Sequence, residues 1–452
     1  MDDTLPGGIV ARVQALGTEL VALAQRLRDR PLVEQEYAVL TTVRQVLPHL
    51  LAAVVHASIS PLDAGRGQVR RRCPTCERRV RVQSWRPRQV QTVCGPITLQ
   101  RPWYVCQVCG HGFSPVDTTL DLPPRARLSA GFEAWLVRLG AATTFRDAVA
   151  VLQDLTGLAV APDTVRQHSI TVGTALEEVQ QTVIAQVRAT QDAAEPVEAA
   201  PGTLVVEADG VMVRYRDGWH EVKVGVVGGT TATGHLTATS YIAAREEAEH
   251  FGPRLLAEAA RRGALDIVRW EGPLTLSGRS LAVLRPVHVV GDGAPWIWNV
   301  AADHFGERTE VVDFYHASQH LWAVARALWG DGTSAAATWA TERIGVLYEQ
   351  GVPPVRAALA AARAPPPAAG EVLRLERGYF ATNAGRMDYP AIRDQGLPIG
   401  SGAVESSAKH VIQHRMKRPG QRWSEHGGRA MCALRAAVAS GRSPAVLAKH
   451  RH

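Results

Sequence analysis

The sequence predicts an α/β protein in which a central sheet follows cysteine-bearing and helical regions, and three observations support this prediction. Residues 203–228 hold two apolar runs separated by Asp217-Gly218, a dipeptide typical of tight β-hairpins. Later strand-like runs alternate with helical patterns, as they do in α/β proteins. Five of the six cysteines lie within residues 73–109, ahead of the sheet.

The length and composition of the chain indicate which classes of protein are expected. With 452 residues, the chain is long enough for about two to four domains and at least one large core. No apolar run approaches the roughly 18–20 residues of a transmembrane helix, and the N-terminus lacks signal-peptide features. We therefore expect a cytoplasmic protein rather than a membrane or secreted one.

The distribution of charge indicates a polyanionic partner. Residues 66–116 hold ten basic residues and one acidic residue, and residues 409–452 do the same. Because the net charge of the chain is only +7, the remainder must be acidic. Two basic blocks on an acidic body favour nucleic acid, which would make the protein nucleoid-associated; two solvated charged faces are the alternative.

Residues 1–65 are predicted to form a helical N-terminal module. Apolar residues recur at helical spacing from Val10 to Leu27, and further helices are predicted over 31–47 and up to Ser58. Nothing in this module carries chemistry, and it is a candidate for self-association.

Residues 66–120 predict a zinc ribbon. Two CxxC knuckles can complete a closed tetrahedral Zn²⁺ site, and in a chain without a secretion signal this clustering favours metal over disulfides. The predicted ligands are Cys73, Cys76, Cys106 and Cys109. Between the knuckles, alternating residues predict a hairpin that turns at Gly95-Pro96. Cys94 and His111 are spare, and Cys94 suits a small core residue better than a ligand.

Residues 121–200 predict a helical DNA-binding region followed by an Ala/Glu/Pro-rich linker. Two short helices, 145–157 and 162–173, flank a loop in the manner of a helix-turn-helix. Thr164, Arg166 and Gln167 then lie early on the second helix, where base edges are read. An ordinary helical hairpin has the same pattern and remains an alternative.

Residues 201–330 predict the first part of the sheet. Its first strand is apolar on both faces, as in a covered sheet, yet it contains Asp209 and, on the same face, Glu207. A third strand, 235–243, and a helix, 246–262, follow the hairpin. Three antiparallel strands and a helix are the opening of an RNase H-like fold. Asp209 is either an acid meeting solvent at a strand end or a metal ligand.

A fourth strand, 287–291, ends at Asp292, which lies where open α/β sheets place their ligands or else caps the next helix. A fifth strand is predicted over 310–316. Within it, Asp313 and His316 could contact the metal site or DNA, or fix the strand end.

The last regions are a helical insertion, 331–396, and a final helix with a basic tail, 397–452. Glu405 lies in the first turn of that helix, beside a core face of Val404, Ala408 and Val411. The basic residues that follow suit phosphate binding: Arg415, Lys417 and Arg418. Trp423 either stacks on a base or belongs to the core.

Over roughly residues 66–440 the chain resembles bacterial insertion-sequence DDE transposases of the ISKra-type family, which are related to the Mutator-like superfamily. The resemblance is carried by EADG around Asp209, VVGDGAPWIW around Asp292, DFYH at 313–316, IGSGAVESSAKHVIQHRMKRPGQRW around Glu405, and CPTC…CQVCGHGFSP. It implies a DNA transposase with Asp209, Asp292 and Glu405 as the catalytic, metal-binding triad. The implied partners are double-stranded DNA, as element ends and target, and further copies of the chain in a homodimer or larger assembly.

Such chemistry needs two Mg²⁺ (or Mn²⁺) ions roughly 3.5–4 Å apart, held by carboxylates, to stabilise the attacking and leaving oxygens of a phosphodiester. Two other functions compete. One is an RNase H-like nuclease or domesticated transposase descendant without strand transfer; the other is a zinc-ribbon DNA-binding regulator without catalysis.

Overall fold

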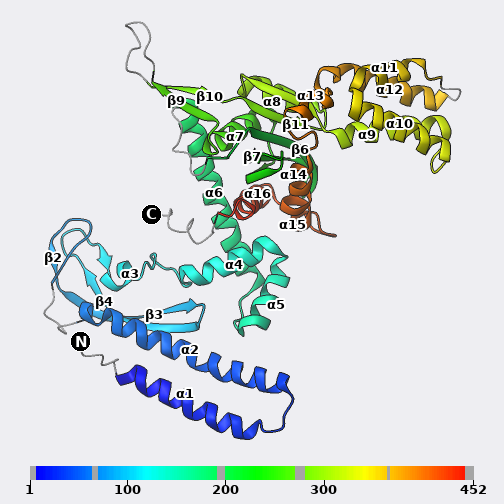
Figure 1. The fold of residues 1–452 in the computed structure, drawn as a ribbon. Helices are drawn as coiled ribbons and strands as arrows, with labels where there is room; N and C mark the ends of the chain where they lie inside the picture. The colour runs from blue at the N-terminus through cyan, green and yellow to red at the C-terminus, as the bar shows by residue number, and fades with distance from the viewer. Residues whose placement is uncertain (1–6, 64–69, 191–198, 270–279, 364–366, 443–452) are drawn as a thin grey trace, which may run out of the picture. The chain divides into compact units, whose positions relative to one another are not determined.

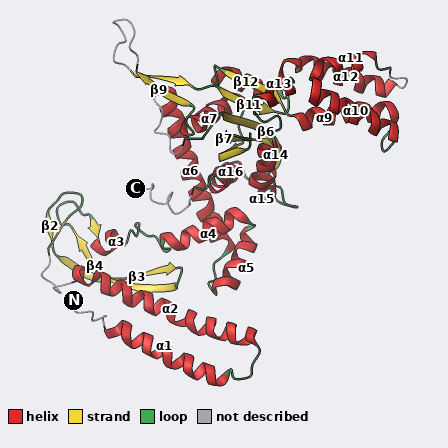
Figure 2. Cartoon of the chain, viewed as in Figure 1, coloured by secondary structure: helices red, strands yellow, loops and turns green. Residues whose placement is uncertain are grey.

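The computed structural model describes residues 7–63, 70–190, 199–269, 280–363 and 367–442 (Figure 1). The chain divides into two compact units, Met1–His168 and Ser169–Leu447, and the boundary falls inside helix α6 (Pro162–Thr190). Helices and strands occur in both units, so the protein is a mixed α/β protein, as predicted (Figure 2).

The first unit begins with two helices, α1 (Gly7–Arg26) and α2 (Leu32–Asp63), where three were predicted. The predicted break before Pro48 was wrong, because a proline removes one helical hydrogen bond without ending a helix that tertiary contacts support. The Pro48 ring packs on Gly95, whose added Cβ would lie 2.6 Å from Pro48 Cγ. The stretch Leu32–Ile59 is long and apolar enough to cross a membrane by length and composition alone, contrary to our expectation.

The cysteine-bearing region forms two small sheets. Strands β1 (Arg71–Arg72) and β2 (Arg79–Val80) pair with each other, and β3 (Val82–Thr92), β4 (Gly95–Val105) and β5 (Gly112–Phe113) form an antiparallel sheet. The predicted hairpin is present, but its turn residues are Val93 and Cys94, because Thr92 already pairs with Gly95. Leu51 and Val55 of α2 pack on the core of this hairpin.

Four helices follow: α3 (Pro115–Thr119), α4 (Ala130–Ala142), α5 (Phe145–Thr156) and α6. Gly157 ends α5 in the left-handed conformation (φ 72°), as the sequence predicted. Helix α6, however, runs for 29 residues instead of the predicted twelve. Its beginning packs through Val165 against α4 and α5.

The second unit contains a five-stranded sheet in the order β12-β11-β6-β7-β8. Its strands are β6 (Leu204–Tyr215), β7 (Gly218–Thr230), β8 (Leu236–Ala244), β11 (Val287–Gly291) and β12 (Arg308–Val312). Strands β6, β7 and β8 are antiparallel neighbours, whereas β11 runs parallel to both β6 and β12. The predicted hairpin, third strand and fourth strand are therefore confirmed. An antiparallel pair, β9 (Leu265–Arg269) and β10 (Ser280–Leu284), was not predicted.

Helices α7 (Ala248–Arg261), α8 (Pro295–His304) and α9 (Phe314–Trp329) pack with the sheet around one hydrophobic core. The predicted fifth strand was too long. It ends at Val312, because the Asp313 side chain accepts a hydrogen bond from the His316 amide and thereby caps α9.

The described residues between 331 and 396 contain only helices, as predicted: α10 (Ser334–Gln350), α11 (Val352–Ala361), α12 (Pro367–Thr382), the 3₁₀ turn Ala384–Arg386 and α13 (Tyr389–Asp394). The last helical run comprises α14 (Gly402–Ser407), a π-helical segment (Ala408–Gln413) and α15 (His414–Met416), and α16 (Glu425–Ala439) follows. Val404, Ala408 and Val411 are buried, so the predicted core face is confirmed.

Candidate carboxylate site and cysteine cluster

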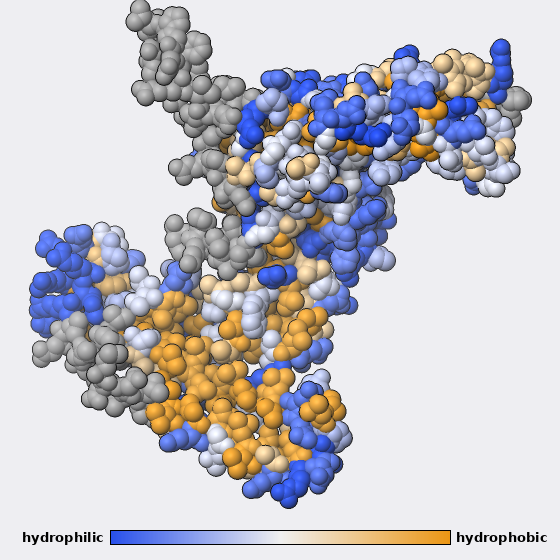
Figure 3. Space-filling model, viewed as in Figure 1, coloured by the Kyte–Doolittle hydropathy of each residue, from blue (hydrophilic) through white to orange (hydrophobic). Residues whose placement is uncertain are grey.

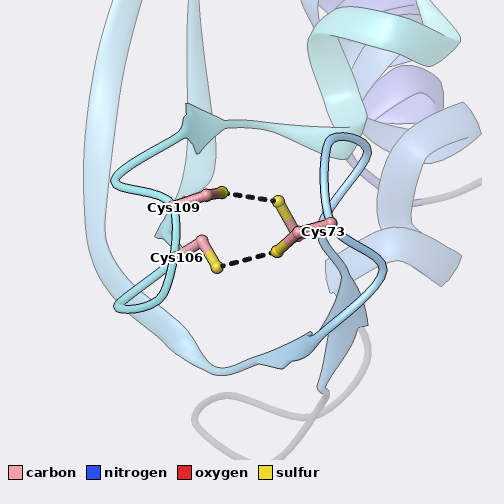
Figure 4. Close-up of side chains that lie close together, drawn as sticks. Cys73, Cys106 and Cys109 are labelled. Atoms are coloured by element: carbon pink, nitrogen blue, oxygen red, sulfur yellow. Dashed lines mark hydrogen bonds between the residues drawn. The ribbon is translucent and has the colours of Figure 1, made fainter.

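The four knuckle cysteines come together in the first unit. Their sulfurs all lie within 4.8 Å of one another, with Cys73 at 3.6 Å from Cys109 and Cys76 at 3.5 Å from Cys106 (Figure 4). A tetrahedral Zn²⁺ with Zn–S bonds of about 2.3 Å places its sulfurs about 3.8 Å apart. The backbone amides of Cys109 and Val108 lower the pKa of Cys106 to about 6, which favours its thiolate, whereas the adjacent sulfur of Cys106 raises the pKa of Cys76 to about 12 despite the Arg78 amide. The cluster therefore fits a zinc ion.

Cys94 and His111, which are not among the four predicted zinc ligands, lie in different environments. Cys94 is half-buried in the β3–β4 turn, where its amide donates to Thr92 Oγ1. The exposed ring of His111 stacks on Phe113, with the ring centroids 6.1 Å apart.

The strand register brings two of the predicted acids side by side in the second unit. Asp209 lies in the middle of β6, the central strand, and Asp292 follows the last residue of β11. Because β11 is parallel to β6 and pairs Gly291 with Ala208, the next residues along the two strands are Asp292 and Asp209. This register places the two carboxylates in neighbouring positions on the sheet.

Glu405 joins them from α14. The Val404 amide, one residue before Glu405, donates to Glu207 Oε2 of β6 at 2.7 Å. Burial, together with the charges of Asp292, Glu405 and Glu221, raises the pKa of Asp209 to about 6. The predicted triad thus forms one electrostatically coupled cluster, in which a second negative charge is costly unless a cation is present.

Glu207 is the buried support of this cluster. It is 2% exposed, and burial raises its pKa to about 7 although the amides of Val404 and Ala403 lower it. It lies on the same face of β6 as Asp209 but bonds the backbone of α14 instead of facing solvent. Glu207 therefore ties the segment that carries Glu405 to the central strand.

Asp313 holds the same segment from the other side. It is 1% exposed; its Oδ1 accepts from the His316 amide at 2.6 Å, and its Oδ2 accepts from Ser401 Oγ at 2.5 Å and from the Ser401 amide. Of the two interpretations of Asp313, fixing the end of a strand is the one these bonds favour.

His316 lies beside the carboxylates. Burial and the neighbouring His320 lower its pKa, whereas the charges of Asp292, Asp313 and Glu405 act in the opposite direction. A lowered pKa leaves the imidazole neutral at pH 7, so that it can accept a proton or a hydrogen bond.

Tyr379, in the helical insertion, was missed by the sequence analysis. Its hydroxyl donates to the main-chain oxygen of Asp292 at 3.1 Å, and its ring stacks on His320 with centroids 3.7 Å apart. No motif marks this tyrosine, because it reaches the site only through the packing of α12 on α9. The one local signal is Gly293, where a Cβ would lie 3.0 Å from the Tyr379 ring.

The predicted DNA-binding residues have different environments. At the start of α6, Arg166 and Gln167 are exposed and bond to Asp163 at 2.7 and 2.9 Å, while Thr164 is half-buried. Near the end of the chain, Lys417 is exposed and Arg418 is half-buried.

The prediction for Arg415 needs correction. This side chain is 0% exposed and lies over the buried Trp423 ring, 5.1 Å from its centroid, so it cannot reach a phosphate. Trp423 belongs to the core and donates to the Met416 carbonyl at 3.1 Å.

Comparison with protein families gives a match over part of the chain. Residues 33–232 match the model of an uncharacterised protein family, UPF0236. The matched part includes the cysteine cluster and Asp209 but ends before Asp292 and Glu405. No curated protein matches the chain.

Proposed function

We propose that the chain is a DDE-type DNA transposase, similar to the ISKra-type family, that cuts the ends of an insertion sequence and joins them to target DNA. One observation carries the proposal: Asp209 and Asp292 on neighbouring strands and Glu405 on α14, from three distant segments, form one electrostatically coupled carboxylate cluster. The strand order, with the antiparallel neighbours β7 and β8 on one side of β6 and the parallel strands β11 and β12 on the other, supports the interpretation of the sheet as RNase H-like.

The three carboxylates would hold two Mg²⁺ (or Mn²⁺) ions, which supply charge stabilisation at both the attacking and the leaving oxygen of the phosphodiester. Asp209, central in the sheet, and Asp292 and Glu405 would be the residues that hold these ions. Glu207 and Asp313 fix the backbone around Glu405, and the neutral His316 can hold a proton beside the site.

The first unit would bind the DNA. The structural Zn²⁺ would hold the two knuckles together, and six arginines of this region are exposed for phosphate contacts: Arg70, Arg72, Arg78, Arg79, Arg81 and Arg86. Arg88 and Arg101 instead pair with Asp117 and support the ribbon. A homodimer or larger assembly, nucleoid-associated in the cytoplasm, follows from the need to hold two element ends.

The proposal is tested with labelled DNA of a candidate element end and the zinc-loaded chain, with and without Mg²⁺. Cleavage at the end is expected only with Mg²⁺, and Asp209→Asn should abolish it while DNA binding persists. Asp303→Asn is the matched control, because Asp303 is an exposed acid of α8 outside the site.

The outcomes separate the three functions. Cleavage followed by joining to target DNA supports the transposase, and cleavage without joining indicates the nuclease or domesticated descendant. Binding without cleavage in the wild type would indicate the DNA-binding regulator and refute catalysis. The exposed arginines of the ribbon are the observation that favours this last alternative.

A further inference from the structure

The helical insertion contributes side chains to the carboxylate site. Tyr379 of α12 donates its hydroxyl to the main-chain oxygen of Asp292 at 3.1 Å. The Asp292 Oδ1 in turn accepts from the Ala294 amide at 2.8 Å, so both the backbone and the carboxylate of Asp292 are oriented by hydrogen bonds. Gly293 allows the close approach, since any Cβ there would press on the Tyr379 ring.

Tyr379 is itself held in place. Its ring stacks on His320 at an interplanar angle of 19°, and His320 Nδ1 lies 2.6 Å from Glu376 Oε2, one turn before Tyr379 on α12. His320 also contacts His316 edge to face, with the ring centroids 4.9 Å apart. The arrangement links α12 of the insertion to α9 and to the end of β11.

We propose that Tyr379 is a positioning residue that orients Asp292 for divalent cation binding, so that the insertion completes the metal site. This inference rests on the proposed function, because it assumes that Asp292 binds a cation. A residue that only stabilised the fold would not change the affinity for metal, whereas loss of this hydroxyl frees the Asp292 backbone at the site.

The test measures Mn²⁺ binding to the zinc-loaded full chain by electron paramagnetic resonance. Tyr379→Phe keeps the ring on His320 and removes one hydrogen bond, so we expect Mn²⁺ affinity to fall about fivefold. Tyr389→Phe is the matched control, since the buried Tyr389 hydroxyl donates to the Val312 carbonyl at 3.0 Å, at the end of the neighbouring strand. The Mn²⁺ affinity of Tyr389→Phe should equal that of the wild type.

Two failures are distinguishable. If Asp209→Asn binds Mn²⁺ as the wild type does, the carboxylates are not the metal site and the proposed function fails with the inference. If Asp209→Asn loses Mn²⁺ but Tyr379→Phe matches the wild type and Tyr389→Phe, only the role of Tyr379 is overturned.

A separate observation concerns the N-terminal helices. Val10, Val13 and Val21 on α1 are 37%, 54% and 63% exposed, whereas Leu23, on another face of the helix, is buried. Helix α2 exposes a second apolar set: Leu32, Val33, Tyr37, Val39, Leu40 and Val54. Apolar residues gather over these helices in Figure 3. Apolar surface on this scale marks an interaction site.

We infer that this surface binds a second copy of the chain through a bundle of the two hairpins. A 20-residue helix is about 30 Å long, and two helices about 10 Å apart present about 600 Å². Two copies would bury about 1,200 Å², which reaches the lower limit of stable interfaces. A lipid bilayer fits less well, because Arg44 and His49 interrupt α2 and its Leu51 and Val55 pack on the ribbon.

The test is the mass of the full chain by size-exclusion chromatography with light scattering. The wild type should be a dimer or larger, and Val13→Glu/Val21→Glu should lower its mass to that of a monomer. Leu375→Glu, at an apolar position of α12 that is 54% exposed, should change nothing. A monomeric wild type, an associated double variant, or vesicle binding that the double variant loses would each overturn the inference.

Discussion

Glu207 offers the most direct test of how the carboxylate site is built. Burial raises its pKa from the usual value of about 4.5 to about 7. Because the folded state favours the protonated acid, Glu207 does not lower the free energy of unfolding below pH 4.5. As the pH rises from 4.5 towards 7, it lowers that free energy increasingly. The shift corresponds to about 3 kcal/mol at 1.36 kcal/mol per pH unit.

Glu207→Gln removes the charge and keeps an oxygen that can accept from the Val404 amide. We therefore expect the variant to be as stable as the wild type at pH 4.5. At pH 8 its free energy of unfolding should be about 3 kcal/mol higher than that of the wild type. For a unit of this size that is roughly 5–10 °C in melting temperature. Glu207→Ala, which leaves the amides of Val404 and Ala403 without the acceptor, should be destabilised at every pH.

The assay is differential scanning calorimetry of the full chain in zinc-containing, magnesium-free buffer. Melting temperatures are compared because a chain of two units does not have a single free energy of unfolding. If the melting temperatures of the wild type and Glu207→Gln change in parallel between pH 4.5 and 8, ionisation of Glu207 does not destabilise the fold. That result would refute the reasoning from burial.

Three further predictions concern other parts of the chain. Cys106→Ser should release zinc and unfold the ribbon, detected as lost zinc in metal analysis and lost DNA binding; retention of both would contradict the cluster. Burial lowers the pKa of His288, so the fold should lose stability as the pH falls below about 6.5, and His288→Gln should remove this dependence in thermal melts. Lys417→Ala should weaken DNA binding and reduce the slope of log affinity against log salt concentration by about 1. Arg415→Met should instead lower the melting temperature, because Arg415 is buried. Equal effects of the two variants on the slope would refute the different roles given to these two residues.

The sequence predicted those features whose cause is local. Asp217-Gly218 marks the hairpin, Val287–Gly291 is a short apolar run before a helix start, and the two CxxC pairs carry their own geometry. Features that depend on tertiary packing were predicted wrongly or missed. Pro48 stays helical because its ring packs on the ribbon, and Arg415 is buried although a run of basic residues usually indicates a surface.

The position of Glu405 shows why a motif alone does not describe the site. The backbone just before it is held by two buried acids, Glu207 at the Val404 amide and Asp313 at Ser401. Each hydrogen bond positions Glu405, yet the charges of Asp313 and Glu405 help to raise the pKa of Glu207, and the charge of Glu405 helps to raise that of Asp209. Precise placement and electrostatic repulsion therefore arise from the same residues. Divalent cations at the cluster would relieve the repulsion and leave the placement intact, so metal binding should stabilise the second unit.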